Sequence, residues 1–209
     1  MLLEAALNGA RAPAEHPALP VTPEQLAREG KASVRAGAGA IHLHVRDGAG
    51  AESLEPDDLA LTIRAVRAAC PGVPVGISTG AWIVPDPERR LALARRWTAL
   101  PDFASVNFGE EGSSELAELL LGLGVGIEAG LAWEADARRF TESASARRCL
   151  RILLEPGEET LEAALRTVAG IERVLDGART PSRRLLHGFG PVAWRLIAEA
   201  ARRGGERRS

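Results

Sequence analysis

The chain has 209 residues, of which 45% are hydrophobic and 26% charged, and its formal net charge is −2. This length allows one large domain or two small ones, and the balanced charge argues against a nucleic-acid-binding protein, which normally carries a clearly basic surface. No apolar run approaches the roughly 18 residues of a membrane span, and no basic segment precedes the short apolar run at the N-terminus, so neither a span nor a signal peptide is expected. Cys70 and Cys149 lie far apart without CxxC spacing, which is typical of a reduced, cytoplasmic protein.

Short apolar runs bounded by glycine and proline alternate with helical patterns along the chain. The predicted strands are residues 2–7, 40–45, 73–78, 103–108, 125–131, 149–154 and 184–187. The predicted helices are residues 22–36, 56–69, 87–96, 113–121, 135–139, 158–175 and 192–201. At the start of the first helix, Thr22, Pro23 and Gln25 match a capping box with proline at the first helical position.

The alternation of strands and helices predicts an α/β fold with parallel strands and right-handed crossovers. An open doubly wound sheet that binds nucleotides would usually carry GxGxxG after its first strand, whereas this chain reads Asn8-Gly9-Ala10-Arg11 there. Polar residues inside the strands favour instead a TIM (β/α)8-type barrel whose mouth forms the active site. We expect about seven βα units in a single domain over residues 1–201, followed by a polar tail at 202–209.

The sharpest motif lies in the second predicted strand. Side chains alternate across a strand, so His42, His44 and Arg46 share one face and the apolar residues between them share the other. Two histidines at this spacing can ligate one metal ion, and Zn²⁺ is the commonest candidate. The alternative is a pair of hydrogen-bonded core histidines.

Further polar residues fall in, or at the ends of, the other predicted strands. Burying so many uncompensated polar groups would be costly, so we expect them to converge on a wet or metal-containing site. For each residue singly, and for Glu155 in particular, the alternative is a strand-end residue hydrogen-bonded to a loop. The residues are Glu4, Asn8, Ser78, Thr79, Asn107, Glu128, Glu155 and His187.

One reaction class is excluded by composition. Lys31 is the only lysine, and it falls among charged residues of a predicted helix rather than at the end of an apolar strand. A Schiff-base mechanism needs a desolvated lysine amine. Lysine-imine aldolase chemistry is therefore not expected.

Five segments, in order along the chain, resemble the β-keto acid cleavage enzyme family, which includes the 3-keto-5-aminohexanoate cleavage enzyme of lysine fermentation. The segments are AALNGA at 5–10, PVTPE at 20–24, GAIHLHVRD at 39–47, ISTG at 77–80 and ASVN at 104–107. The resemblance implies a zinc-containing (β/α)8 barrel that forms homo-oligomers. It also implies condensation of a small β-keto acid with acetyl-CoA and cleavage of the adduct into acetoacetate and a new CoA ester.

The resemblance also implies roles for individual residues. It makes His42 and His44 zinc ligands, with zinc acting as a Lewis acid toward the keto group. It sets Ser78 near the substrate, and it carries the family's strand-four asparagine over to Asn107 and its strand-five glutamate to Glu128. Together with these, Thr79 and Arg46 are expected to bind or orient the substrate.

The chain departs from the family pattern in two places. Arg11 stands where the family often has a glutamate. The family's eighth strand, approximately R-x-G-x-E-D, supplies the third zinc ligand and has no counterpart here, since Glu206 is the only acidic residue after the last predicted helix. We therefore expect a C-terminally incomplete barrel. Glu4, Glu128 or His187 is then the candidate additional ligand or catalytic group, because catalytic zinc usually has three protein ligands.

Two other functions stay open at this point. The first is a catalytically impaired homologue that binds ligands or oligomerises. The second is a metal-dependent hydrolase on the same barrel. Hydrolases with HxH usually carry it on the first strand, and its position on the second strand here counts against that alternative.

Overall fold

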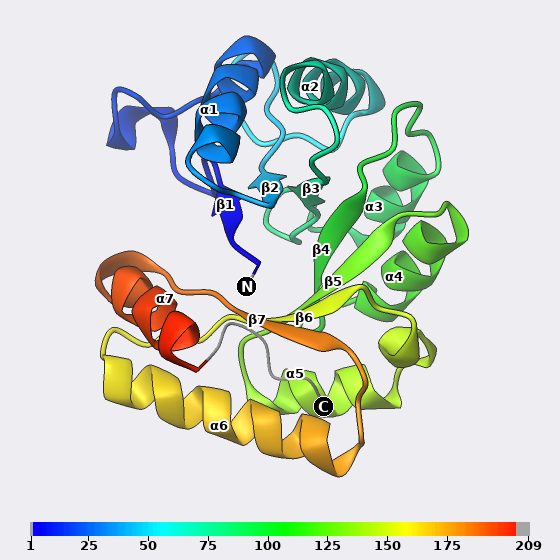
Figure 1. Cartoon of the computed structure of the whole chain (residues 1–209). Helices are drawn as coiled ribbons and strands as arrows, with labels where there is room; N and C mark the ends of the chain where they lie inside the picture. The colour runs from blue at the N-terminus through cyan, green and yellow to red at the C-terminus, as the bar shows by residue number, and fades with distance from the viewer. Residues whose placement is uncertain (1, 204–209) are drawn as a thin grey trace. The chain divides into compact units, whose positions relative to one another are not determined.

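A computed structural model describes residues 2–203, and within them seven β-strands alternate with seven α-helices (Figure 1). The strands are β1 (Glu4–Ala6), β2 (Ala40–Leu43), β3 (Val75–Ser78), β4 (Phe103–Asn107), β5 (Gly126–Leu131), β6 (Arg151–Leu154) and β7 (Arg183–Leu186). The α-helices are α1 (Pro23–Arg35), α2 (Pro56–Ala69), α3 (Pro87–Ala94), α4 (Ser113–Gly122), α5 (Glu134–Glu142), α6 (Leu161–Gly177) and α7 (Ala193–Arg202). Short 3-10 helices are η1 (Pro13–Glu15), η2 (Ala144–Arg147) and η3 (Gly190–Val192). Every predicted strand and helix is confirmed, with ends shifted by three residues at most.

The chain divides into two compact units, an N-terminal unit of residues 2–105 and a C-terminal unit from Val106 onward. Strand β4 crosses the boundary between them. The single domain expected over residues 1–201 stays a prediction. Helix α7 includes Arg202, the first residue of the expected polar tail, and residues 204–209 of that tail lie outside the described residues.

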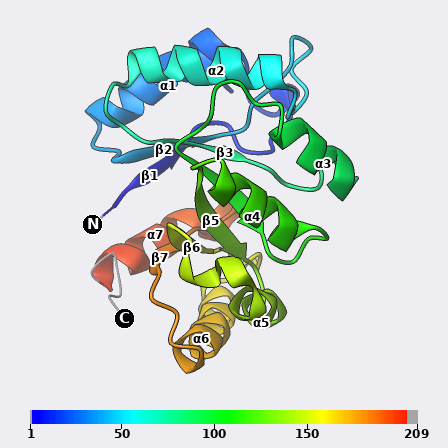
Figure 2. The same ribbon diagram turned by 90° about the vertical axis from the view of Figure 1, so that its right-hand side faces the viewer.

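In the N-terminal unit, β1 pairs with β2, β2 with β3 and β3 with β4, all parallel and in chain order. The register sets His42 between Ala6 of β1 and Gly76 of β3. Helices α1 and α2 pack side by side (Figures 1 and 2). The expected capping box begins α1, since Gln25 N donates to Thr22 Oγ1 at 3.2 Å and Thr22 N donates to Gln25 Oε1 at 3.0 Å.

In the C-terminal unit, β5 pairs with β6 and β6 with β7, again parallel and in chain order. Helices α5 and α6 pack against each other (Figure 2). Val192 at the end of η3 and Leu196 within α7 form a buried cluster with Ala164 of α6. Parallel neighbours require a crossover, and here each crossover contains a helix, as the sequence predicts.

Parallel pairing brings the carboxyl ends of successive strands to one edge. In the N-terminal unit, Asn8, His44 and Ser78 therefore follow or end β1, β2 and β3 at a common edge. Both cysteines are buried and unbridged. Among the residues described, no helix has the length and apolar character needed to span a membrane.

Candidate functional site

The two histidines of the HxH motif lie close together and are buried. Each is 8% exposed, their ring centroids are 5.5 Å apart, and the ring planes are inclined by 72°. Ile41 and Leu43 on the opposite face are fully buried, so the alternation expected from the sequence is present. Strand β2 ends at Leu43, and the extended chain carries His44 one residue further.

An amide side chain holds the backbone at His44 in place. His44 N donates to Asn8 Oδ1 at 2.8 Å, and Asn8 Nδ2 donates to His44 O at 2.8 Å and to Pro20 O at 3.3 Å. The Asn8 side chain thus continues the β1–β2 pairing beyond the end of the ladder. Asn8 is one of the residues that the strand pattern predicts to converge on the site, and its amide positions the backbone of His44.

A tight turn then brings a carboxylate back to His44. Asp47 N donates to Ala51 O at 2.8 Å, and Arg46 and Glu52 form an isolated antiparallel β-bridge. This reversal brings Glu52 Oε1 into a short hydrogen bond with His44 Nδ1. The side chains of Glu52 and His44 are largely buried, at 13% and 10% exposure. One nitrogen of the His44 ring is therefore engaged by a carboxylate.

Trp82 completes this arrangement. Its Nε1 donates to Glu52 Oε2 at 3.0 Å, and its ring stacks on His44 with centroids 6.1 Å apart and planes inclined by 25°. The indole lies so close over Gly80 that an added Cβ there would collide with it. The glycine of the Ser-Thr-Gly motif thus makes room for Trp82.

A second carboxylate lies beside His42. Glu4 Oε1 on β1 is 4.0 Å from His42 Nδ1, and the Glu4 and His42 side chains are 9% and 11% exposed. Two imidazoles and a carboxylate are donors that zinc accepts. Two imidazoles on one zinc ion, each about 2.0–2.1 Å from it, have ring centroids about 5 Å apart. The separation of 5.5 Å observed for His42 and His44 is close to that value, and Glu4 and His42 offer ligand atoms within 4.8 Å of one another.

The buried guanidinium of Arg46 binds backbone. Its Nη1 donates to Gly50 O at 2.9 Å, and its Nη2 donates to Gly9 O at 2.9 Å and to Arg11 O at 2.7 Å. These bonds tie the loop after β1 to the turn after β2. The expected role of Arg46 in substrate binding stays a prediction, and the bonds show a clamp between two loops.

The two hydroxyl residues at the end of β3 differ in their partners. Thr79 Oγ1 donates to Ser105 O at 2.6 Å, so its hydroxyl hydrogen is used within the fold. Ser78 Oγ accepts a long bond of 3.4 Å from Gly80 N. Of the two, Ser78 retains its O–H as a donor.

In the C-terminal unit, polar strand residues meet over a glycine. Asn107 Nδ2 donates to Glu110 Oε1 at 2.8 Å. Asn107 and Glu155 both lie against Gly130, and an added Cβ there would collide with both side chains. Burial raises the pKa of Glu155 to about 8, and the nearby carboxylates of Glu128, Glu110 and Asp136 add to this effect.

Glu128 and His187 are the remaining predicted residues of this unit. Glu128 is fully buried and forms a short ion pair with Arg151 on β6. His187 follows β7, and its ring packs edge-on against Phe189 with centroids 4.5 Å apart. Whether Glu128 or His187 ligates a metal stays a prediction.

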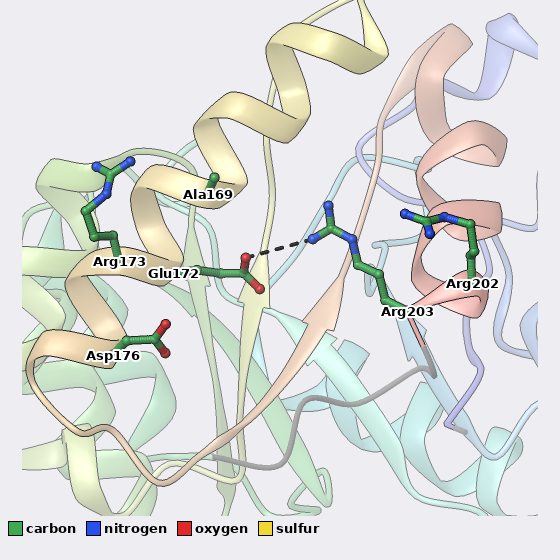
Figure 3. A pocket seen from close by; sticks show the side chains of 6 residues that line it. All are labelled: Ala169, Glu172, Arg173, Asp176, Arg202 and Arg203. Carbon is green, nitrogen blue, oxygen red and sulfur yellow. Dashed lines mark ion pairs between the residues drawn. The ribbon is translucent and has the colours of Figure 1, made fainter.

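A pocket of the same unit lies elsewhere, between α6 and the end of α7 (Figure 3). Its charged side chains compensate one another, as in the pair of Arg203 Nη1 and Glu172 Oε2 at 3.8 Å. No residue predicted for the site lines it. The lining residues are Ala169, Glu172, Arg173, Asp176, Arg202 and Arg203.

Comparison with known proteins decides the family. The sequence model for the beta-keto acid cleavage enzyme matches residues 1–119, which is more than half of the chain. The chain belongs to the beta-keto acid cleavage enzyme family. The resemblance expected from the HxH and Ser-Thr-Gly segments is therefore confirmed.

Relatives of this family member bear two names. The 3-keto-5-aminohexanoate cleavage enzyme of Fusobacterium nucleatum is 40% identical over 91 residues, which are 43% of this chain and 34% of that protein. The enzyme of the same name from Acetoanaerobium sticklandii is 34% identical over 112 residues, 52% of this chain and 41% of that protein. The 3-oxoadipate:acetyl-CoA acetyltransferase of Cupriavidus necator is 35% identical over 95 residues, 46% of this chain and 32% of that protein. The chain thus matches about a third to two fifths of the length of these relatives.

Solved structures share the fold of this family member. A 3-dehydroquinate dehydratase from Geobacillus kaustophilus superposes with a TM-score of 0.59 at 10% identity, over 91% of this chain and 74% of that one. A mandelate racemase/muconate lactonizing enzyme from Roseiflexus sp. gives 0.55 at 15% identity, over 90% of this chain and 48% of that one. Both are TIM-barrel enzymes, and at these identities the likeness concerns the fold alone.

Two residues of the site are absent from the sequence-based set, namely Glu52 and Trp82. The signal for Glu52 is the turn Asp47-Gly48-Ala49-Gly50, since a reversal there returns the chain alongside the HxH strand. The signal for Trp82 is weaker. It follows the Ser-Thr-Gly motif by two residues, and nothing in the sequence shows which way its ring turns.

Proposed function

We propose that the chain is a zinc-dependent transferase that converts a small β-keto acid and acetyl-CoA into acetoacetate and a new CoA ester. Family membership supports the reaction class, and the name of the Cupriavidus necator relative includes acetyl-CoA. The observation that carries the proposal is the buried pair of imidazoles at 5.5 Å in a member of this family. We further propose a TIM-barrel-type fold, for which the fold likeness gives support, and a cytoplasmic homo-oligomer, as the family resemblance and the unbridged cysteines suggest.

In this proposal His42 and His44 hold the zinc ion, and Glu4 is the adjacent carboxylate best suited to join them. Its carboxylate oxygen is already 4.0 Å from His42 Nδ1. When bound, zinc would supply a Lewis acid for the keto group of the substrate. The low exposure of both histidines excludes bulk water from this position, which strengthens any charge interaction there.

The other residues of the site are proposed to bind the substrate or to hold the loops around it. Ser78, 3% exposed at the end of β3, can donate its hydroxyl hydrogen to a substrate oxygen. Asn107 is proposed as a substrate contact on the family pattern alone. Thr79 and Arg46, whose donors bind backbone carbonyls, would act by holding the neighbouring loops. The turn that Arg46 holds leads to Glu52, so Arg46 also helps to position the carboxylate that bonds His44.

Metal analysis of the purified full chain tests the proposal. We expect close to one zinc per chain, lost on changing His42 or His44 to alanine because two imidazoles supply most of the ligand field. His16→Ala is a matched control, since His16 is exposed and outside the site. Zinc that persists in both the His42→Ala and the His44→Ala variants, or no zinc in the parent chain, would contradict the metal site. Acetoacetate formed from acetyl-CoA and a panel of β-keto acids then tests the reaction.

A further inference from the structure

We infer that Glu52 is a positioning residue that fixes the tautomer of His44, and that Trp82 fixes Glu52 in turn. The inference deepens the proposed function and rests on it, since there His44 is a zinc ligand, and with Nδ1 engaged by Glu52 the ring nitrogen left for the metal is Nε2. Glu52 Oε1 bonds His44 Nδ1, and Glu52 Oε2 accepts from Trp82 Nε1 at 3.0 Å. Both oxygens of one carboxylate are therefore in use, each by a different ring.

The direction of these bonds determines where the His44 proton lies. An indole N–H only donates, so Glu52 Oε2 must accept from Trp82. An ionised carboxylate only accepts, so His44 Nδ1 must carry the hydrogen in the bond to Oε1. In the neutral imidazole, Nε2 then keeps its lone pair. That lone pair is the ligand atom that a zinc ion needs.

The fold builds this contact from several elements. The turn at Asp47 is fastened by its own side chain, since Oδ1 accepts from Ala49 N and Ala51 N at 2.9 Å each. The bridge between Arg46 and Glu52 sets the register of the returning chain. On the other side, Gly80 lets the Trp82 ring approach. The carboxylate is thus held from both sides at 13% exposure.

A plain structural ion pair between Glu52 and His44 is the competing interpretation. An ion pair needs only opposite charges, so it sets no tautomer. The two interpretations differ for the variant Glu52→Gln, because an amide has one acceptor oxygen where a carboxylate has two. With Trp82 N–H and His44 Nδ1–H both seeking an acceptor, the single oxygen of the introduced amide can serve only one of them.

Glu52→Gln is therefore the decisive variant. The indole N–H can only donate, whereas the imidazole can move its hydrogen to the other nitrogen, so we expect the amide oxygen to accept from Trp82. The amide NH₂ then faces His44 and requires Nδ1 as acceptor, which moves the ring hydrogen to Nε2. We expect the ¹⁵N shifts of the metal-free chain at about pH 9, where an ordinary imidazole is neutral, to show Nδ1–H in the parent and Nε2–H in the variant. We also expect zinc to bind the variant about 10- to 100-fold more weakly.

A second substitution should restore the parent state. In Glu52→Gln combined with Trp82→Phe, no indole N–H competes, so the amide can turn its oxygen to His44 Nδ1–H. We expect the Nδ1–H tautomer and most of the zinc affinity to return. Trp82→Phe alone should change the tautomer little. Glu29→Gln, at a carboxylate on α1 whose side chain is 43% exposed, is the control for loss of charge.

Each outcome separates this inference from the proposed function. A parent His44 with its hydrogen on Nε2, or a zinc affinity indifferent to Glu52→Gln in a chain whose zinc depends on His42 and His44, would overturn the positioning role and leave the zinc site standing. Absence of zinc binding in the parent would overturn the proposed function, while the tautomer of the metal-free chain would still decide the role of Glu52. Failure of the double variant to restore the Nδ1–H tautomer would also count against the positioning role of Glu52.

Discussion

Glu155 is the residue whose protonation differs most clearly from its ordinary behaviour. Burial, then the neighbouring carboxylates, raise its pKa from 4.5 to about 8. Between these two pKa values the unfolded chain releases a proton that the folded chain keeps, so the free energy of unfolding falls as the pH rises. The folded chain therefore has its full stability only below pH 4.5, the ordinary pKa of the carboxyl group. Glu155→Gln cannot ionise, so we expect it to be more stable than the parent at pH 8 by on the order of a few kcal/mol and equal to it near pH 4.

Denaturant unfolding at several pH values measures this difference. Glu159→Gln, an exposed carboxylate of the same unit, is the matched control and should leave the pH dependence unchanged. A parent and a Glu155→Gln chain with parallel stability profiles would show that the Glu155 carboxyl titrates as it does in water.

The residue-level prediction from sequence reaches the histidines and misses their partner. Strand alternation alone sets His42 and His44 on one face, because the period of a strand is two. Glu52 depends on the length of the turn and on the register of the bridge with Arg46, neither of which a periodic pattern contains. Arg46 shows the converse difficulty. Its position on the histidine face predicts a substrate contact, while its donors bind the carbonyls of two loops.

The turn after β2 and the loop after β1 behave as one element because Arg46 joins them. Arg46→Met keeps an unbranched side chain in place of the aliphatic part of arginine and removes three donated hydrogen bonds, to Gly50, Gly9 and Arg11. Hydrogen bonds from charged groups contribute roughly 1.5–3 kcal/mol each when lost from buried carbonyls, so we expect a loss of at least about 2 kcal/mol in unfolding free energy. Thermal unfolding measures it.

A second substitution at this position tests the substrate role of Arg46. If the guanidinium also bound substrate, Arg46→Lys, which keeps a charge and loses the fork of donors, would raise KM with kcat unchanged. We expect instead that stability and zinc content fall together, since the clamped loop leads to Glu52. A rise in KM at undiminished stability would favour the substrate contact over the clamp.

At the level of elements, the sequence predicts the fold well because its signals are local. The capping box at Thr22 starts α1, and the proline at Pro56 marks the start of α2. The ends of strands follow the sequence pattern less closely. Strand β1 is three residues long where the sequence predicts six, and at its C-terminal end the Asn8 side chain takes over the pairing with β2 from the backbone.

At the level of the whole molecule, the proposed zinc ligands all come from the N-terminal unit of residues 2–105. A ligand that binds only the folded state raises its stability by mass action, by about 2.7 kcal/mol at a hundredfold excess over Kd. In a chain of 209 residues each kcal/mol raises Tm by about 2–4 °C, so zinc should raise it by about 5–10 °C. His42→Ala should abolish this shift, and His187→Ala, in the other unit, should keep it.

Hydrogen exchange locates the same effect along the chain. If Glu4, His42 and His44 hold the metal, zinc should increase amide protection mainly in β1, β2 and the turn at Asp47, because the bound state then requires those strands to be folded. Protection gained chiefly around β5 or β7, together with loss of the Tm shift in His187→Ala, would transfer the third ligand to Glu128 or His187. Each unit is compact by itself, so the two can unfold in separate transitions. In that case the rise in Tm caused by zinc should appear in the transition of residues 2–105.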